Sequence, residues 1–201
     1  MPLLASRRVV LGLVGGAAAA LVSLPAAAAD AAAQLIERTA SEVLQIIKTT
    51  SPGPARQAAM QKVLQTYFDL PYMGQTALGA NWNKTDQPQQ VRFLKAVESA
   101  EARAYSERFG QYGGQTVTVG KVTSRPNGVY MVDSRINQTS GQPIKVEWEV
   151  RDVGRGLRIT DVKVEGVSMV MTRRSDFNSY IQNNGGTVEP LIKELESRSG
   201  R

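Results

Sequence analysis

The sequence contains no cysteine and no histidine. Without cysteine the chain can form no disulfide, no thiolate-bound zinc site, no iron–sulfur cluster and no thiol nucleophile. Without histidine it lacks the commonest general base and the commonest metal ligand, so a Ser-His-Asp triad is excluded. Ser–Lys and paired-carboxylate chemistry stay open. A chain with no thiol to mispair is also compatible with an oxidising compartment.

Basic residues are only slightly more numerous than acidic ones. The chain has 24 Lys and Arg against 18 Asp and Glu, a formal net charge of +6. Two of the arginines lie in an N-terminal leader without acidic residues, which leaves 22 basic and 18 acidic residues, a net charge of +4. This excess favours an anionic surface such as lipid headgroups, and it does not predict nucleic-acid binding. With 201 residues, of which 42% are hydrophobic, the chain is long enough for one domain with a core.

Residues 1–29 have the features of a cleavable signal peptide. Arg7 and Arg8 form its basic region, residues 9–24 are apolar, and the small residues 26–29 offer cleavage sites. The apolar region is short for a retained membrane helix. The paired arginines also resemble a twin-arginine signal, so export by the Sec or the Tat route stays open. Residues 30–201 are then expected to form a single domain.

Helical periodicity fills the first half of that domain. Asp86 and Gln89 have the spacing of a capping box at the start of the longest helix. Two shorter helices are expected at the C-terminus, one containing Phe177 and one that begins at Thr187. The earlier helices are expected over residues 31–50, 55–68, 71–78 and 88–109.

Between these helical segments the periodicity changes to two. Strands are expected over residues 116–119, 129–138, 144–151 and 157–165, and the turns between them are short. In the fourth strand the apolar positions change face. A β-bulge near Thr160 and Asp161 would keep both sets buried, or else the strand is covered on both faces. The fold class predicted is α+β, with a four-stranded antiparallel sheet covered by several helices.

Motifs spread along the chain resemble one family. GQPI-x-V-x-W occupies residues 141–148, I-x-DV-x-VEGVS occupies residues 159–168, and R-S-x-F follows at 174–177. Upstream, YFD at 67–69, M-x(4)-LG at 73–79, Trp82 and YGG at 112–114 fit as well. Together they cover roughly residues 34–195. The chain resembles the MlaC family, also called the toluene-tolerance auxiliary family, of periplasmic phospholipid-binding proteins.

The resemblance implies carriage and not catalysis. It implies a periplasmic shuttle that carries a phospholipid between an outer-membrane lipoprotein complex and an inner-membrane ABC-type transport complex, maintaining membrane lipid asymmetry. It places the acyl chains in an apolar cavity between sheet and helices, without a cofactor. A diacyl lipid has about 30 CH₂ groups, and exposing each of them to water costs about 0.8 kcal/mol. The acyl chains therefore need an apolar pocket, with a volume of about 1,000 Å³. A hopanoid-type or other envelope lipid is an alternative cargo.

The candidate site consists of apolar residues for the acyl chains and a basic pair near them. Arg173 and Arg174 are candidates for contact with a headgroup or a partner protein, and a solvated face is the simpler interpretation of such a pair. For each apolar candidate, structural core is an equally good interpretation. The candidates for the cavity wall are Met73, Leu78, Val97, Tyr105, Val146, Trp148, Val164, Val167 and Met169.

Two other classes of function stay open. Composition alone favours a filled core, which would suit a structural or adaptor protein. Many small alanines on the helices, and adaptable methionines such as Met73, instead suit an irregular cavity. A cavity of this kind also occurs in α+β enzymes. However, Asp161 and Glu165 have no base partner and are interpreted as structural, pairing with Arg151 or Arg158. The sequence therefore predicts no catalytic residue and no metal site.

Overall fold

The computed structural model describes residues 24–108 and 113–199. Most of the predicted signal peptide, residues 1–23, lies outside the described residues, as does the predicted end of the longest helix at Phe109. Among the described residues, no helix has the length and apolar character needed to cross a bilayer.

The helices begin and end close to the predicted positions, with two exceptions. The first helix begins at Leu24, several residues earlier than predicted, because an alanine-rich segment with high helix propensity precedes it. The helix predicted around Phe177 begins at Met169 and includes Arg173 and Arg174. The helices are α1 (Leu24–Thr49), α2 (Pro54–Tyr67), α3 (Leu70–Leu78), the 3₁₀ helix η1 (Gly79–Lys84), α4 (Gln87–Arg108), α5 (Met169–Asn183) and α6 (Glu189–Ser199).

The sheet is antiparallel, as predicted, and its strands lie in chain order. It has five strands where four were expected. The additional strand pairs with the preceding one across a two-residue turn in which Glu165 and Gly166 both have positive φ, 50° and 81°. The strands are β1 (Thr116–Arg125), β2 (Val129–Asn137), β3 (Ile144–Asp152), β4 (Leu157–Val164) and β5 (Val167–Ser168).

The predicted bulge in β4 is confirmed. Glu149 pairs with Asp161 and Val150 pairs with Ile159, so Thr160 is the extra residue. Thr160 is buried, and its hydroxyl donates to Glu149 Oε1 at 2.8 Å. The bulge keeps the apolar residues on both sides of it on one face of the sheet. A second bulge, between Val119 and Val122, lets β1 continue beyond its predicted end.

Asp161 and Glu165 are structural, but their partners differ from those predicted. Asp161 Oδ1 accepts hydrogen bonds from the backbone N–H of Val162 and of Val170, so it helps to cap the start of α5. Glu165 accepts from the backbone N–H of Lys145. The predicted pairing with Arg151 or Arg158 is therefore wrong for both carboxylates, because Arg151 pairs with Glu149 in the same strand.

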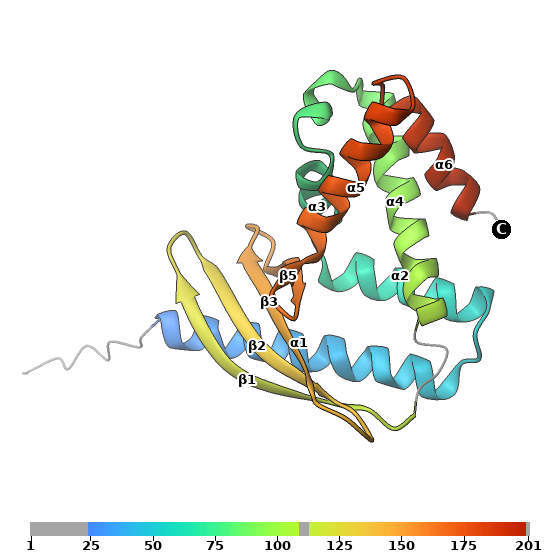
Figure 1. Cartoon of the computed structure of the whole chain (residues 1–201). Coiled ribbons are helices and arrows are strands. Elements are labelled where there is room, and N and C mark those ends of the chain that lie inside the picture. The colour runs from blue at the N-terminus through green and yellow to red at the C-terminus, as the bar shows by residue number, and fades with distance from the viewer. Residues whose placement is uncertain (1–23, 109–112, 200–201) are drawn as a thin grey trace, which may run out of the picture.

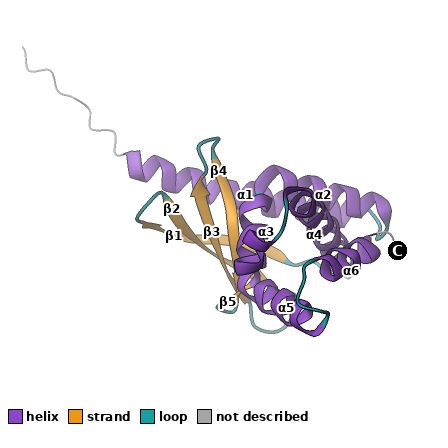
Figure 2. Cartoon of the chain, turned by 90° about the horizontal axis from the view of Figure 1, so that it is seen from above, coloured by secondary structure: helices purple, strands orange, loops and turns teal. Residues whose placement is uncertain are grey.

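Two hydrophobic clusters organise the molecule. α1 crosses one face of the sheet and packs Leu35 and Ile36 against Val132, Val150 and Ile159. Helices α3 to α6 stand to one side of the sheet and form the second cluster among themselves. α2 joins the two groups, because it packs on both α1 and α4 (Figures 1 and 2).

The capping box of α4 supplies a prediction. The backbone N–H of Gln89 donates to Asp86 Oδ1 at 2.8 Å, and Gln89 Oε1 accepts from the Asp86 N–H at 3.4 Å. Asp86→Ala should lower the free energy of unfolding by about 1 kcal/mol, measured by urea denaturation. Asp86→Ser keeps a capping oxygen and should stay within a few tenths of a kcal/mol of the wild type. Equal losses in both variants would contradict the capping role.

Candidate functional site

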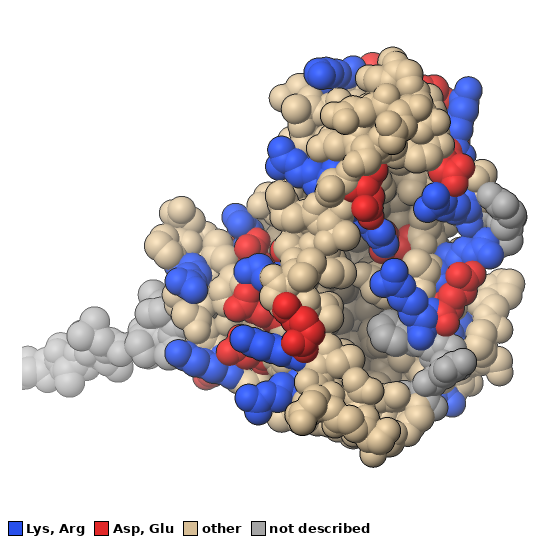
Figure 3. All heavy atoms as spheres, viewed as in Figure 1, with Lys and Arg blue, Asp and Glu red and all other residues tan. Residues whose placement is uncertain are grey.

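An apolar cavity of about 130 Å³ lies among helices α2 to α5. Its wall is mostly aliphatic and aromatic, with a few charged residues at its edge. The lining residues are Leu64, Phe68, Leu70, Met73, Gly74, Ala77, Leu94, Val97, Glu98, Glu101, Tyr105, Arg108, Met169, Val170, Thr172, Arg173 and Phe177. Figure 3 shows the molecule hollowed on the face between the helices and the sheet.

The cavity lies where the helical group meets the sheet, as two contacts around residue 68 show. Phe68, on its wall, forms a parallel bridge with Ile159 of β4, and the N–H of Asp69 donates to the Ile159 carbonyl at 2.9 Å. No residue of β1 to β4 in the described part of the chain lines this cavity. Helices make the wall of this cavity, and the sheet lies beside it.

Four of the nine apolar candidates come together on this wall. They are Met73 of α3, Val97 and Tyr105 of α4, and Met169 at the start of α5. Two helices close in sequence and a third about 60 residues further along therefore supply them. Arg173, one of the two basic candidates, lies on the edge of the same cavity.

The other candidates lie elsewhere. Leu78 is fully buried in the helical cluster. Val146, Trp148 and Val164 share the sheet face that α1 covers, and Val146 is only 2% exposed. Val167 in β5 is 55% exposed. Arg174 lies against Gly79, where its guanidinium occupies the space that a side chain would need.

Several wall residues were missed by sequence reasoning. Leu64, Phe68 and Leu94 have helical spacing that is equally typical of filled core. Phe68 lies in the YFD motif, and that motif was the one signal pointing to it. Gly74 lets α3 approach α4, since a Cβ there would collide with the Leu94 side chain.

The edge of the cavity carries a network of polar side chains. Glu98 Oε1 accepts hydrogen bonds from Gln61 and Gln65 of α2, both at 2.6 Å. Arg173 of α5 forms an ion pair with Glu101 of α4, with Nη2 3.2 Å from Oε2. Burial works to lower the pKa of Arg173, but the hydrogen bond and charge of Glu101 outweigh it, so the pKa is raised and the group stays cationic.

Tyr105 lies on the apolar part of the wall, and its ionisation supplies a prediction. Burial raises the pKa of its phenol to about 12, and the negative charge of Glu101 adds to the shift. In the unfolded chain the group ionises near pH 10. Its contribution to stability is therefore complete below pH 10 and is lost as the pH rises toward 12. Absorbance titration should show a component that ionises near pH 12, and that component should be absent from Tyr105→Phe.

Metal chemistry has little to build on in this site. Among residues 24–108 and 113–199, no group of three or more acidic side chains lies together in a way that could hold a metal ion. The carboxylates that are present, such as Glu98 and Glu101, are engaged by amide and guanidinium donors. What the site offers is an apolar wall with a charged edge.

Comparisons with known proteins agree with this arrangement. The family described as MlaC protein matches residues 37–197. Toluene tolerance protein ttg2D of Pseudomonas putida is 20% identical over 171 residues, which cover 82% of this chain and 80% of the relative. A similar fold occurs in a phospholipid-binding protein from Ralstonia solanacearum, solved in complex with a phospholipid. Its TM-score is 0.70 at 20% identity, over 84% of this chain and 96% of the other. The chain belongs to the MlaC family.

Proposed function

We propose that this protein binds a phospholipid, holds its acyl chains in the cavity among α2 to α5, and carries it through the periplasm. The observation that carries the proposal is the cavity itself: an apolar wall built from four helices, with a charged edge at Glu101 and Arg173. An apolar wall with a charged edge fits an amphiphile, which has apolar acyl chains and a polar headgroup. Family membership, and a relative of the same fold solved with a phospholipid, support the same ligand class.

Uptake of a lipid requires the cavity to widen. At about 130 Å³ it is far below the roughly 1,000 Å³ that two acyl chains need. Unbranched side chains such as Met73 and Met169 occupy the space between the helices and can adopt other rotamers at small cost. The helical cluster and the sheet cluster are separate cores joined through α2, so a change in their separation can enlarge the cavity without breaking either core.

The wider role follows from carriage. We propose that the chain is exported through the N-terminal segment 1–29 and that residues 30–201 form the carrier. It would receive lipid at one membrane complex and deliver it to another, an outer-membrane lipoprotein complex and an inner-membrane ABC-type transporter being the two partners. The cost of exposing acyl chains to water, about 0.8 kcal/mol per CH₂, is the physical reason why such transfer needs a carrier.

The proposal is tested by what the protein holds when it is isolated. The full chain, expressed with its own leader, is purified from the periplasm without detergent, and an organic extract is analysed by mass spectrometry. We expect glycerophospholipid in a near-stoichiometric amount. A polycyclic lipid of hopanoid type would support the carrier function and change the lipid assigned to it. An extract at background level, with no uptake from phospholipid vesicles either, would contradict carriage.

A further inference from the structure

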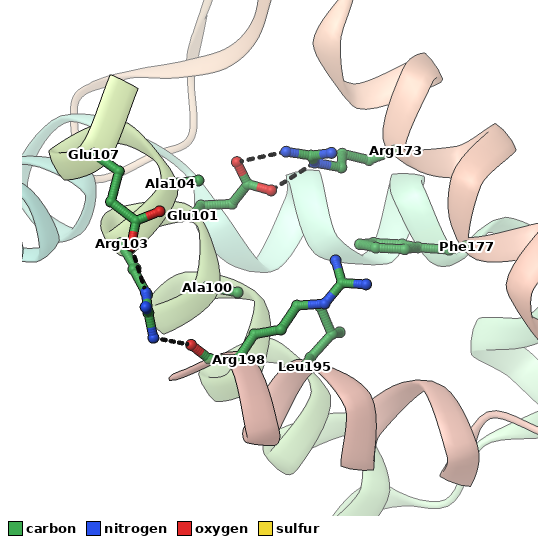
Figure 4. A pocket seen from close by; sticks show the side chains of 9 residues that line it. All are labelled: Ala100, Glu101, Arg103, Ala104, Glu107, Arg173, Phe177, Leu195 and Arg198. Carbon is green, nitrogen blue, oxygen red and sulfur yellow. Dashed lines mark hydrogen bonds and ion pairs between the residues drawn. The ribbon is translucent and has the colours of Figure 1, made fainter. Parts of the chain in front are cut away.

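A second hollow, of about 360 Å³, lies between α4, α5 and α6. Three guanidinium groups gather on its wall, those of Arg103, Arg173 and Arg198, around apolar surface that includes Phe177 and Leu195. Figure 4 shows Arg173 reaching in from α5 and Arg198 from α6. Three arginines line this hollow, against two in the first cavity, and we call it the arginine pocket.

The arginine pocket and the apolar cavity share one boundary. Glu101, Arg173 and Phe177 line both. Arg173 and Phe177 are four residues apart, so they lie on the same face of α5, and Glu101 faces them from α4. α5 packs chiefly on α3, and α6 chiefly on α4, so side chains and not packed backbones separate the two hollows here. Movement of the Arg173–Glu101 pair would connect them.

The three arginines are held in place by bonds that an anion can replace or share. Arg103 bonds Glu107 Oε1 at 2.7 Å and the Arg198 carbonyl at 2.9 Å, so it fixes α4 to α6. Arg198 bonds Glu194 through Nε, and its terminal nitrogens can turn to another acceptor. Its side chain is 60% exposed, and ion pairs this exposed are weak. A phosphate offers the bidentate acceptor that a guanidinium fork matches best.

We propose that the arginine pocket binds the anionic phosphate of an amphiphile whose acyl chain passes the Arg173–Glu101 boundary into the apolar cavity. The proposal rests on the proposed lipid-carrying function and adds to it the place and the charge preference of the headgroup. On the wall itself three arginines face two carboxylates, Glu101 and Glu107, and Glu194 and Asp176 pair with Arg198 and Arg173 from beside it, so a phosphate has to displace carboxylates from these guanidinium groups. Arg173 exchanges the Glu101 carboxylate for the phosphate, and this exchange opens the boundary.

The test compares two lipids with the same acyl chains, anionic phosphatidylglycerol and uncharged diacylglycerol. Each is offered in vesicles to the full mature protein, and the lipid bound is quantified by mass spectrometry after gel filtration. The double variant Arg103→Gln/Arg198→Gln should hold about tenfold less phosphatidylglycerol than the wild type, with diacylglycerol unchanged. Arg103→Lys/Arg198→Lys keeps the charge and should retain most of the binding, which separates loss of charge from loss of fold.

The matched control is Arg92→Gln. Arg92 also lies on α4 and is ion-paired, with Glu189 and Glu196, but it lines neither hollow. This variant should bind both lipids as the wild type does. If the double glutamine variant also binds phosphatidylglycerol as the wild type does, the proposal is overturned while carriage stands. If the wild type takes up neither lipid, the proposed function itself falls.

Free phosphate is the other source of the same chemistry. Isothermal titration of the wild type and the double glutamine variant with inorganic phosphate distinguishes the two. Phosphate binding that depends on Arg103 and Arg198, together with unchanged phosphatidylglycerol uptake, would assign the pocket to a free anion and overturn the lipid headgroup assignment. Weak phosphate binding with a strong effect on phosphatidylglycerol supports it.

Discussion

Val97→Asp is expected to reduce the amount of bound phospholipid by about a hundredfold. Val97 lies on the wall of the apolar cavity, on the α4 side. A carboxylate there would lose its hydration when the acyl chain covers it, or would have to bind a proton before the chain enters. Either route costs several kcal/mol, and each 1.4 kcal/mol is a tenfold change in affinity. The measurement is lipid retained after uptake from phosphatidylglycerol vesicles.

The same helix supplies the control for this variant. Val91 also lies on α4, but it is 61% exposed and lines neither hollow. Val91→Asp makes the same chemical change at the surface and should leave lipid binding and the circular dichroism spectrum unchanged. If Val97→Asp binds lipid as well as Val91→Asp does, Val97 does not face the acyl chains, and the cavity among α2 to α5 is not the lipid site.

The second large effect concerns stability. Phe93→Ala is expected to lower the free energy of unfolding by about 3–5 kcal/mol, a large part of the roughly 5–15 kcal/mol that domains have. Phe93 is fully buried in the helical cluster, and its ring meets that of Phe177 edge to face, with centroids 5.7 Å apart. The variant loses both the transfer free energy of the ring and the packing around the cavity left behind. Urea denaturation measures it.

A double-mutant cycle tests the contact between the two rings. Phe177→Ala alone should cost less in total if the boundary between the two hollows can partly collapse. The aromatic contact itself should appear as a coupling of about 0.5–1.5 kcal/mol between Phe93→Ala and Phe177→Ala. Additive losses would mean that the rings act separately. In that case the ring contact would add nothing to stability beyond the burial of each side chain.

Local signals in the sequence were sufficient for much of the fold. The capping box at Asp86 marked the start of α4. The side chains of Asp86 and Gln89 accept hydrogen bonds from backbone N–H groups that have no partner within the helix. The change of apolar face in β4 predicted the bulge at Thr160, because the two-residue period of a strand leaves few other ways to bury both sets. Both are short-range effects, and they do not depend on how the elements pack.

Two elements of the fold differ from what the sequence predicted. The first helix was expected to begin at residue 31 and begins at Leu24, because the alanine-rich segment before residue 31 has high helix propensity. The fifth strand was missed because a two-residue strand has no periodicity of its own. It is held by its turn and by its pairing with β4.

The family and the α+β class were determined by the sequence alone, since they rest on motifs and periods that the residues carry with them. Which apolar residues face the cavity was decided only by the tertiary structure. Val97 and Val146 have the same side chain, and both were candidates for the cavity wall. One faces the cavity among the helices, and the other lies on the sheet face that α1 covers. The periodicity of the sequence indicates that one face of a helix or strand is buried. What covers that face depends on contacts between elements far apart in the chain.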